Sequence, residues 1–365
     1  MPTEAQILDS IRVVEDPDLH RDIVSLGMVK EIRIEGARIR VRVELTTPAC
    51  PLKEKIKGDV QQAVSSLPGV KEVNVEMSAT VRKAPSLTPQ GTPPGIKNVI
   101  AVASGKGGVG KSTVCVNLAI ALARSGARVG LMDADIYGPN IPLMLGIPSE
   151  TRPQVAPDEK IIPLEACGLR VISMGVLVPP EAPMVWRGPM LHSAVTQFLN
   201  KVQWGELDYL MVDLPPGTGD VQLSLVQTVS VTGAVIVTTP QEVALLDVRK
   251  GIAMFQKTNV PILGVVENMS SFVCPHCNEE TPIFGRGGGK KEAEKLGVPF
   301  LGEIPIDPRI RRGGDEGEPI VAAHPESTVA KQFVQAAGVL AQQVSIVDVL
   351  GHRPAVVEGA GKGRG

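Results

Sequence analysis

Alternating apolar and polar positions mark the N-terminal part of the chain. Within residues 29–36 and 37–46, apolar side chains follow a period of two at Ile32, Ile34, Ile39, Val41, Val43 and Leu45. This period of two is typical of β-strands that bury one face. Glu35 and Gly36 stand between the two runs. The pattern therefore predicts a β-hairpin whose turn lies at these two residues.

Helical periodicity appears on either side of this hairpin. Residues 4–14 form an amphipathic pattern, a second helix is expected to open at Pro51, and residues 70–78 predict a last strand. The resulting α-β-β-α-β order is typical of a small α+β domain. We expect this domain to end near residue 82, because residues 83–97 are rich in proline, glycine and hydroxyl side chains and predict a linker.

Beyond the linker the apolar runs are continuous instead of alternating. Such runs are typical of parallel strands that helices cover on both faces. We predict a doubly wound, mostly parallel α/β domain over residues 98–345, followed by a disordered tail over 346–365. The expected strands lie at residues 99–104, 128–135, 169–175, 209–217, 233–240, 261–269 and 300–307, with clear helices over 112–126 and 242–258.

Composition narrows the class of protein. The 365 residues carry 37 basic and 39 acidic side chains, and aromatic residues make up 3% of the chain. This balance lacks the basic excess that nucleic acid or an anionic membrane attracts, so we expect neither as a partner. No apolar run is long enough for a membrane span or a signal peptide, and five cysteines are an odd number for a disulfide framework. We expect a cytoplasmic protein with reduced thiols.

A phosphate-binding loop follows the first strand of the second domain. Gly105, Gly110, Lys111 and Ser112 fit the pattern G-x-x-x-x-G-K-[ST], between a strand and a helix as that motif requires. Backbone N–H groups of this loop can surround phosphates, Lys111 can reach the β- and γ-phosphates, and the Ser112 hydroxyl can hold Mg²⁺. The expected nucleotide-binding residues are Gly105, Lys106, Gly107, Gly108, Val109, Gly110, Lys111, Ser112 and Thr113.

The phosphate cradle does not need the additional Lys106. Its position resembles the signature lysine of the deviant Walker A group, which includes the Min and Par partition ATPases, the nitrogenase iron protein and the ApbC/Mrp carriers. The resemblance implies that Lys106 contacts nucleotide phosphates across a dimer interface, where it would act on the transferred phosphate as an arginine finger does. A solvated loop lysine is the alternative.

Three aspartates end or follow apolar strands. Asp133 and Asp135 follow one run and Asp213 ends another, at the edge of a parallel sheet where ligands bind. Asp213 is expected to reach Mg²⁺ through water. Of Asp133 and Asp135, one can organise the Mg²⁺ sphere and the other can orient the attacking water, and by resemblance Asp135 takes the second role.

Asn268, Pro305 and Asp307 match positions that hold adenine in the same group. Asparagine and aspartate are frequent at strand ends in any case, where they cap helices and form turns.

Cys274 and Cys277 form a C-x-x-C pair after the strand that carries Asn268. A tetrahedral zinc site or a cubane cluster needs four ligands, so one chain provides only half of them. Cys115 lies inside the predicted P-loop helix, and Cys167 begins what looks like a buried strand. We expect two chains to contribute one pair each and to hold a [4Fe-4S] cluster on a two-fold axis. Zinc shared by two chains and a thioredoxin-like redox pair are alternatives.

The second domain resembles the ApbC/Mrp family of P-loop iron–sulfur cluster carrier ATPases. "GKGGVGKST", "DADIYGPN", "WRGPM", "DLPPGTGD", "ENMS" and "CPHC" match in order. The first 80 residues are similar to a small accessory domain in bacterial members, in which a cysteine follows a Thr-Pro pair. Here that residue is Cys50, expected to be a transfer thiol with a pKa lowered by the nearby helix or, alternatively, a packing cysteine.

The resemblance implies a homodimeric ATPase that uses ATP and Mg²⁺ and delivers a labile [4Fe-4S] cluster to apo-proteins. Nucleotide state would change the segment after Asp213 and the loop near residues 187–189, although no single role is assigned to those three residues. A partition-type ATPase without a cluster and a nitrogenase-like reductase are the competing hypotheses.

Overall fold

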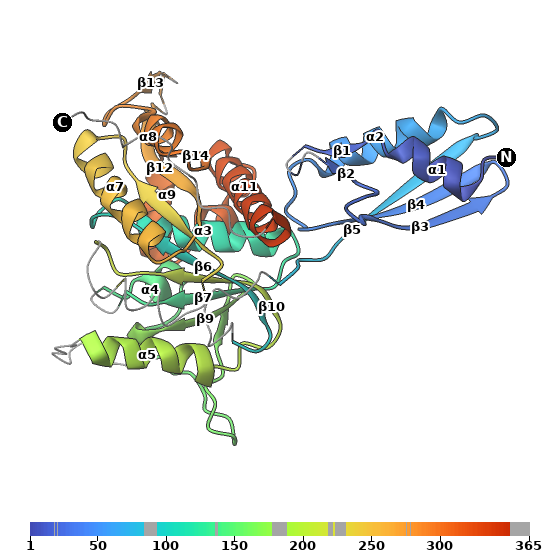
Figure 1. Ribbon diagram of the computed structural model, residues 1–365. Helices are drawn as coiled ribbons and strands as arrows, with labels where there is room; N and C mark the ends of the chain where they lie inside the picture. Colours follow the sequence, from blue (N-terminus) through green and yellow to red (C-terminus); the bar gives the residue numbers. More distant parts are fainter. Residues whose placement is uncertain are drawn as a thin grey trace, which may run out of the picture. The chain divides into compact units, whose positions relative to one another are not determined.

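The chain forms two compact units, Met1–Arg82 and Lys83–Gly365. The computed structural model describes residues 1–17, 19, 21–83, 93–135, 138–176, 188–217, 222, 231–274, 276–277 and 279–350. Figure 1 shows both units, and each is described by itself below.

The N-terminal unit is a three-stranded sheet covered by two helices. Its central strand β4 pairs with β3 antiparallel and with β5 parallel. In β4 buried and exposed residues alternate, as the period of two predicts. Ile56, Val60 and Val64 on α2 are fully buried at a spacing of four, and burying each such side chain is worth about 1.5–3 kcal/mol. The elements are α1 (Glu4–Ile11), β1 (Glu15–Asp16), β2 (Arg21–Asp22), β3 (Val29–Glu35), β4 (Arg38–Leu45), α2 (Lys53–Ser65) and β5 (Glu72–Ala79).

Three details of this unit differ from the sequence prediction. Helix α1 ends at Ile11, and the short antiparallel pair β1 and β2, which was not predicted, follows it. The hairpin turn lies at Gly36 and Ala37, because Glu35 pairs with Arg38 and Gly36 adopts a φ of 64°. Helix α2 begins at Lys53, two residues after Pro51.

The second unit has a nine-stranded sheet in the order β13-β12-β11-β6-β10-β7-β9-β8, with β14 also paired to β12. Strands β7, β10 and β11 are buried at every residue, which confirms that continuous apolar runs lie between helical layers. The strands are β6 (Ile96–Ala103), β7 (Val129–Asp133), β8 (Leu164–Ala166), β9 (Leu169–Ser173), β10 (Leu207–Asp213), β11 (Gly233–Thr238), β12 (Ile262–Val273), β13 (Glu280–Thr281) and β14 (Phe300–Ile306).

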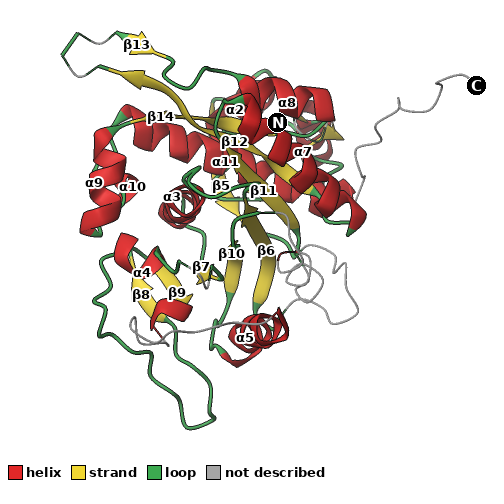
Figure 2. Ribbon diagram, turned by 90° about the vertical axis from the view of Figure 1, so that its left-hand side faces the viewer, coloured by secondary structure: helices red, strands yellow, loops and turns green. Residues whose placement is uncertain are grey.

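Helices cover both faces of this sheet, as a doubly wound fold requires. Side chains of α5, α7 and α8 join one core with strand residues, whereas α3 and α11 pack together on the other side. Figure 2 shows α3 and α7 on opposite sides of β6, β10 and β11. The helices are α3 (Lys111–Arg124), α4 (Ile141–Met144), α5 (Gly188–Lys201), α7 (Glu242–Lys257), α8 (Gly288–Leu296), α9 (Pro308–Glu316), α10 (Ile320–Ala323) and α11 (Thr328–Leu350), with a 3₁₀ turn at Met174–Val176.

Several boundaries in the second unit differ from expectation. Strands β8 and β13 are antiparallel to their neighbours, so the sheet is mostly but not entirely parallel. Strand β6 begins at Ile96, inside the predicted linker, and α11 continues to Leu350, inside the predicted tail. Residues 351–365 lie outside the described residues. Among the helices that the structure describes, none is long and apolar enough to cross a membrane.

Candidate functional site: a P-loop centre and a cysteine hairpin

The phosphate-binding loop connects β6 to α3. Two of its glycines are required by packing. A side chain on Gly105 would overlap the backbone of Asp247 in α7. Gly110, the residue before α3, has a φ of 80°, and a side chain there would overlap the Asn268 amide. Gly107 and Gly108 are exposed between them, so the loop presents its backbone to solvent.

Four predicted residues meet at the start of α3. The Lys111 Nζ lies 2.7 Å from Asp213 Oδ1 and 3.5 Å from Asp135 Oδ2. The Ser112 hydroxyl donates a hydrogen bond of 2.6 Å to Asp213 Oδ2. The Lys111 side chain is only 6% exposed and that of Asp213 is 1% exposed. The lysine, the hydroxyl and two carboxylates therefore form one buried cluster.

Burial and charge oppose each other in this cluster. Burial disfavours the charged form of Lys111, but the carboxylates of Asp213 and Asp135 outweigh it and raise the lysine pKa. Burial raises the pKa of Asp213 despite the opposing effects of Lys111 and Ser112. Asp135 Oδ1 is buried and has no hydrogen-bond partner among the described residues. Such an unsatisfied oxygen, beside a hydroxyl and a second carboxylate, fits a site for a hydrated hard cation.

Asp133 lies beneath this cluster and is fully buried. Its Oδ2 accepts a hydrogen bond from the Ser173 hydroxyl at 2.9 Å, and its Oδ1 accepts one from the Asp135 backbone N–H at 3.1 Å. Burial, reinforced by the charge of Asp213, raises the pKa of Asp133 to about 8. Asp133 thus fixes the backbone of Asp135.

Lys106 is half-buried in the loop, where its carbonyl accepts a hydrogen bond from the Ser104 hydroxyl at 2.9 Å. Its ammonium group has no ion pair with the residues that the structure describes. By contrast, Val109 is 2% exposed and Thr113 lies in the first turn of α3. The role of Lys106 across a dimer stays a prediction.

Asn268 connects the P-loop to strand β12. Its side-chain amide donates a hydrogen bond of 2.9 Å to the Val109 carbonyl. Pro305 lies on the neighbouring strand β14, whose Ile304 pairs with Asn268. Asp307 caps α9, where its carboxylate accepts a hydrogen bond of 2.8 Å from the Arg309 N–H. The adenine contacts of these three residues stay predictions.

The cysteine pair lies on a hairpin between β12 and β13. The Cys274 N–H donates a hydrogen bond of 3.0 Å to the Glu279 carbonyl. Backbone N–H groups of Cys277 and His276 hydrogen-bond to the Cys274 sulfur and lower its pKa. Cys274 is half-buried and Cys277 is exposed. Figure 2 shows this hairpin projecting from the unit beyond β14.

The other cysteines of this unit lie elsewhere. Cys115 is buried in α3, as predicted, and burial raises its pKa. Cys167 does not begin a buried strand. It is exposed in the turn between β8 and β9, at the opposite edge of the sheet from the hairpin, with a φ of 50°. Within the described ranges, no three His, Cys, Asp or Glu side chains form a group that could hold a metal ion.

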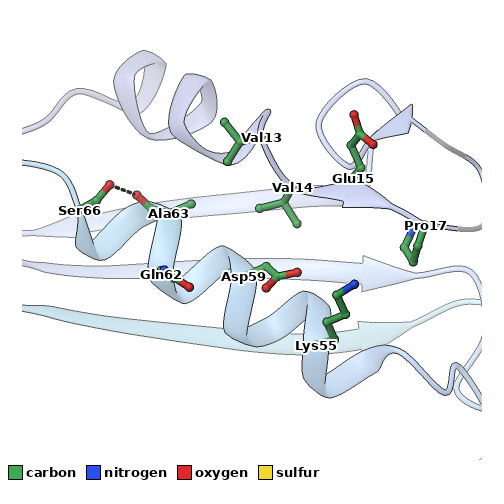
Figure 3. Close-up of a pocket in the computed structure, with 9 residues that line it drawn as sticks. All are labelled: Val13, Val14, Glu15, Pro17, Lys55, Asp59, Gln62, Ala63 and Ser66. Atoms are coloured by element: carbon green, nitrogen blue, oxygen red, sulfur yellow. Dashed lines mark hydrogen bonds between the residues drawn. The ribbon is translucent and has the colours of Figure 1, made fainter.

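Cys50 belongs to the N-terminal unit, where it is half-buried and packs against the core of that unit, before α2. The same unit has an open cleft of about 610 Å³ between α2 and the segment after α1. Figure 3 shows Glu15, Lys55 and Asp59 at this cleft, which Cys50 does not line. The transfer role of Cys50 stays a prediction.

Some residues that shape the site were not predicted from the sequence. Ser173 holds Asp133, and Asp247 packs against Gly105. Glu267 is fully buried and accepts hydrogen bonds from the Gly287 and Gly289 N–H groups at the start of α8. The only sequence signal for Glu267 is a glutamate at the end of an apolar run, directly before Asn268. Arg187 lies outside the described residues, and Gly188 opens α5.

Comparison with known proteins identifies a family for each part of the chain. Residues 95–341 match the family of the NUBPL iron-transfer P-loop NTPases, and residues 4–77 match the iron–sulfur cluster assembly protein family. The chain is 55% identical to an iron–sulfur cluster carrier protein of Deinococcus radiodurans over 342 residues, which cover 93% of this chain and 95% of that protein.

Solved structures show the same fold. A nucleotide-binding protein of Archaeoglobus fulgidus in complex with ADP is 41% identical, with a TM-score of 0.57, over 66% of this chain and 92% of that one. The cell division ATPase MinD of Pyrococcus furiosus is 28% identical, with a TM-score of 0.50, over 67% and 98%. With its buried P-loop cluster, its cysteine hairpin and both matched domains, the chain belongs to the iron–sulfur cluster carrier family of P-loop NTPases.

Proposed function

We propose that this protein is a cytoplasmic, homodimeric ATPase that binds a labile [4Fe-4S] cluster through Cys274 and Cys277 and transfers it to apo-proteins. The observation that carries the proposal is the position of the two cysteines. They lie on a projecting hairpin that is continuous with the strand contacting the P-loop. A cargo held there is accessible to a client, whereas a resident cofactor is usually enclosed.

The nucleotide site supports ATP hydrolysis with Mg²⁺. Ser112 and Asp213 would hold the hydrated ion, and Asp133 would support it by fixing the backbone of Asp135. When bound, Mg²⁺ neutralises charge on the β- and γ-phosphates. Lys111, which now pairs with Asp213, would move toward the same phosphates, and Asp135 would orient the attacking water.

A dimer would complete both sites. Two thiolates from each chain give the four ligands that a cubane cluster needs, because Cys115 is buried and Cys167 lies at the far sheet edge. Lys106, which has no ion-pair partner among the described residues, would then reach the nucleotide of the second copy. Cys50 would accept iron or a cluster on the way to a client.

Anaerobic reconstitution with iron and sulfide tests the cluster. We expect four irons and four sulfides per dimer in the wild type and none on the hairpin after Cys274→Ala with Cys277→Ala. Cys167→Ala is the matched control and should load normally. Colourless dimers with intact ATP turnover would favour zinc or a partition-type switch.

Lys106→Ala tests the dimer in the catalytic step. We expect ATP turnover to fall to background while iron loading on the hairpin persists, and Lys160→Ala, an exposed loop lysine, should change neither. Wild-type turnover in Lys106→Ala would remove Lys106 from the mechanism.

A further inference from the structure

Strand β12 joins the nucleotide site directly to the cysteine hairpin. Asn268 in this strand hydrogen-bonds the Val109 carbonyl of the P-loop. The strand ends at Val273, and Cys274 is the next residue. Any change in the backbone between Asn268 and Val273 therefore changes how Cys274 is presented relative to the P-loop.

Met269 breaks the regular backbone of this strand. Its φ is 58°, in the left-handed region that side chains without a short polar group rarely adopt. Three other non-glycine residues of the described chain share this conformation, Glu159, Cys167 and Asn259, and all three lie outside strands. Met269 alone of the four lies inside a strand, so its conformation must be maintained by its surroundings.

A bulge accompanies this conformation. Asn268 pairs with Ile304 and Phe272 pairs with Ile306, so four steps along β12 match two steps along β14. Bulges of this kind bend a strand and redirect side chains, and they are frequent beside functional sites. Here three residues of β12, Met269, Ser270 and Ser271, stand opposite the single residue Pro305 of β14. Both serines are buried.

The bulge lies beside the P-loop. A methyl group placed on Gly110 would lie 3.7 Å from the Met269 Cε and would also meet the Asn268 amide. Gly110 is the last loop residue before Lys111, which begins α3. A movement of the P-loop around bound phosphates would therefore press on Asn268 and Met269 first.

Both sides of the bulge are anchored. Before it, Glu267 accepts hydrogen bonds from Gly287 and Gly289 at the start of α8. After it, Phe272 and Val273 pair with β13, and the Cys274 N–H donates to Glu279. The segment between these anchors is the part of β12 that can change register without breaking either one.

We propose that the bulge at 269–271 links the nucleotide state of the P-loop to the presentation of Cys274 and Cys277, with Met269 as its positioning residue. In the structure described here, Met269 stays left-handed because Asn268 is tied to Val109. Release of that hydrogen bond lets Met269 return to an extended conformation, and the hairpin shifts along β14. The inference deepens the proposed function, on which it rests for the role of the two thiols.

Alkylation of the cluster-free, reduced protein by iodoacetamide tests the link. The rate at each cysteine is measured by peptide mass spectrometry without nucleotide, with ADP and with a non-hydrolysable ATP analogue. In the wild type we expect nucleotide to change the rates at Cys274 and Cys277 by about fivefold, a modest coupling. The rate at Cys167, at the opposite sheet edge, should not change and serves as an internal control.

Met269→Gly should remove this response. Glycine adopts the left-handed conformation without penalty and lacks the side chain that lies beside Gly110, so the hairpin no longer senses the nucleotide. Nucleotide affinity should stay within about threefold of wild type. The matched control is Asn259→Gly, an exposed left-handed residue after α7, which should respond as the wild type does.

Each outcome bears on one of the two proposals. The link would be overturned if Met269→Gly responded as the wild type does, or if Asn259→Gly lost the response equally. It would also be overturned if the wild type bound nucleotide without any response. None of these outcomes would affect iron loading. Mass in solution is measured alongside, and a response that only follows dimer formation would also overturn it. Failure to load iron, with the thiol response present, would instead count against the carrier function.

Discussion

The P-loop centre and the cysteine hairpin differ most in burial. Lys111, Asp133 and Asp213 are enclosed by strands β7 and β10 and by α3, and their charges act on one another at short range. Cys274 and Cys277 lie on a projecting two-stranded hairpin. Backbone N–H groups stabilise the Cys274 thiolate. Electrostatic catalysis benefits from a fixed, low-dielectric site. A carrier must instead release its cargo, which a solvent-exposed pair allows.

Lys111→Met is the change that should separate the two regions most strongly. It keeps most of the length of the side chain but removes the charge, so ATP turnover should fall by about 10²–10³-fold. It also leaves buried carboxylates without their cation, and the free energy of unfolding should fall by about 3 kcal/mol. Phosphate release and urea unfolding measure these effects.

Iron loading on the hairpin is the contrasting readout for Lys111→Met. We expect the folded variant to load iron as the wild type does, because the lysine and the hairpin share no contact in the described chain. Loss of iron from a variant that stays folded would show that the two sites are not separable.

The pH dependence of stability sharpens the contrast at the buried centre. The Asp133 pKa is raised to about 8 in the folded protein, so the folded state keeps a proton that the unfolded state loses above about pH 4. Stability from this group is present below that pH and is lost as pH rises toward 8, with a limiting slope of about 1.4 kcal/mol per pH unit. Thermal unfolding in metal-free buffer should show the decline.

Asp133→Asn should flatten that decline, because an amide does not titrate. Ser173→Ala is the control for the lost hydrogen bond and should lower stability while keeping the slope. A wild-type curve that is flat between pH 4 and 8 would contradict a protonated Asp133.

The smallest expected effect concerns two cysteines of this unit, the half-buried Cys274 and the exposed Cys167. Hydrogen bonds from backbone N–H groups lower the pKa of Cys274, whereas desolvation raises that of Cys167 although its side chain is exposed overall. Alkylation at Cys274 should therefore increase at a lower pH, with a several-fold rate difference near pH 8. His276→Ala should leave the Cys274 profile unchanged, because its backbone N–H remains. Coincident profiles for the two cysteines would contradict this.

Local patterns in the sequence determined much of this protein. The P-loop, the three aspartates at strand ends and the C-x-x-C pair were all identified there, because each depends on residues close together in the chain or on one strand. The continuous apolar runs likewise predicted a doubly wound sheet, since burial on both faces excludes alternating polarity. The short pair β1 and β2 was missed because two-residue strands have no period to detect.

Tertiary structure decided the contacts between distant segments. Ser173 on β9 holds Asp133, and α7 requires a glycine at position 105. The raised pKa of Asp133 depends on its burial and on the charge of Asp213 from another strand. Cys167 was assigned to a buried strand from its apolar neighbours, yet the antiparallel turn after β8 exposes it. The left-handed Met269 has no sequence signal at all, because the register shift that accompanies it arises only when β12 pairs with β14. Residue types specify local chemistry, whereas burial, charge coupling and strain arise only when strands far apart in the chain are packed together.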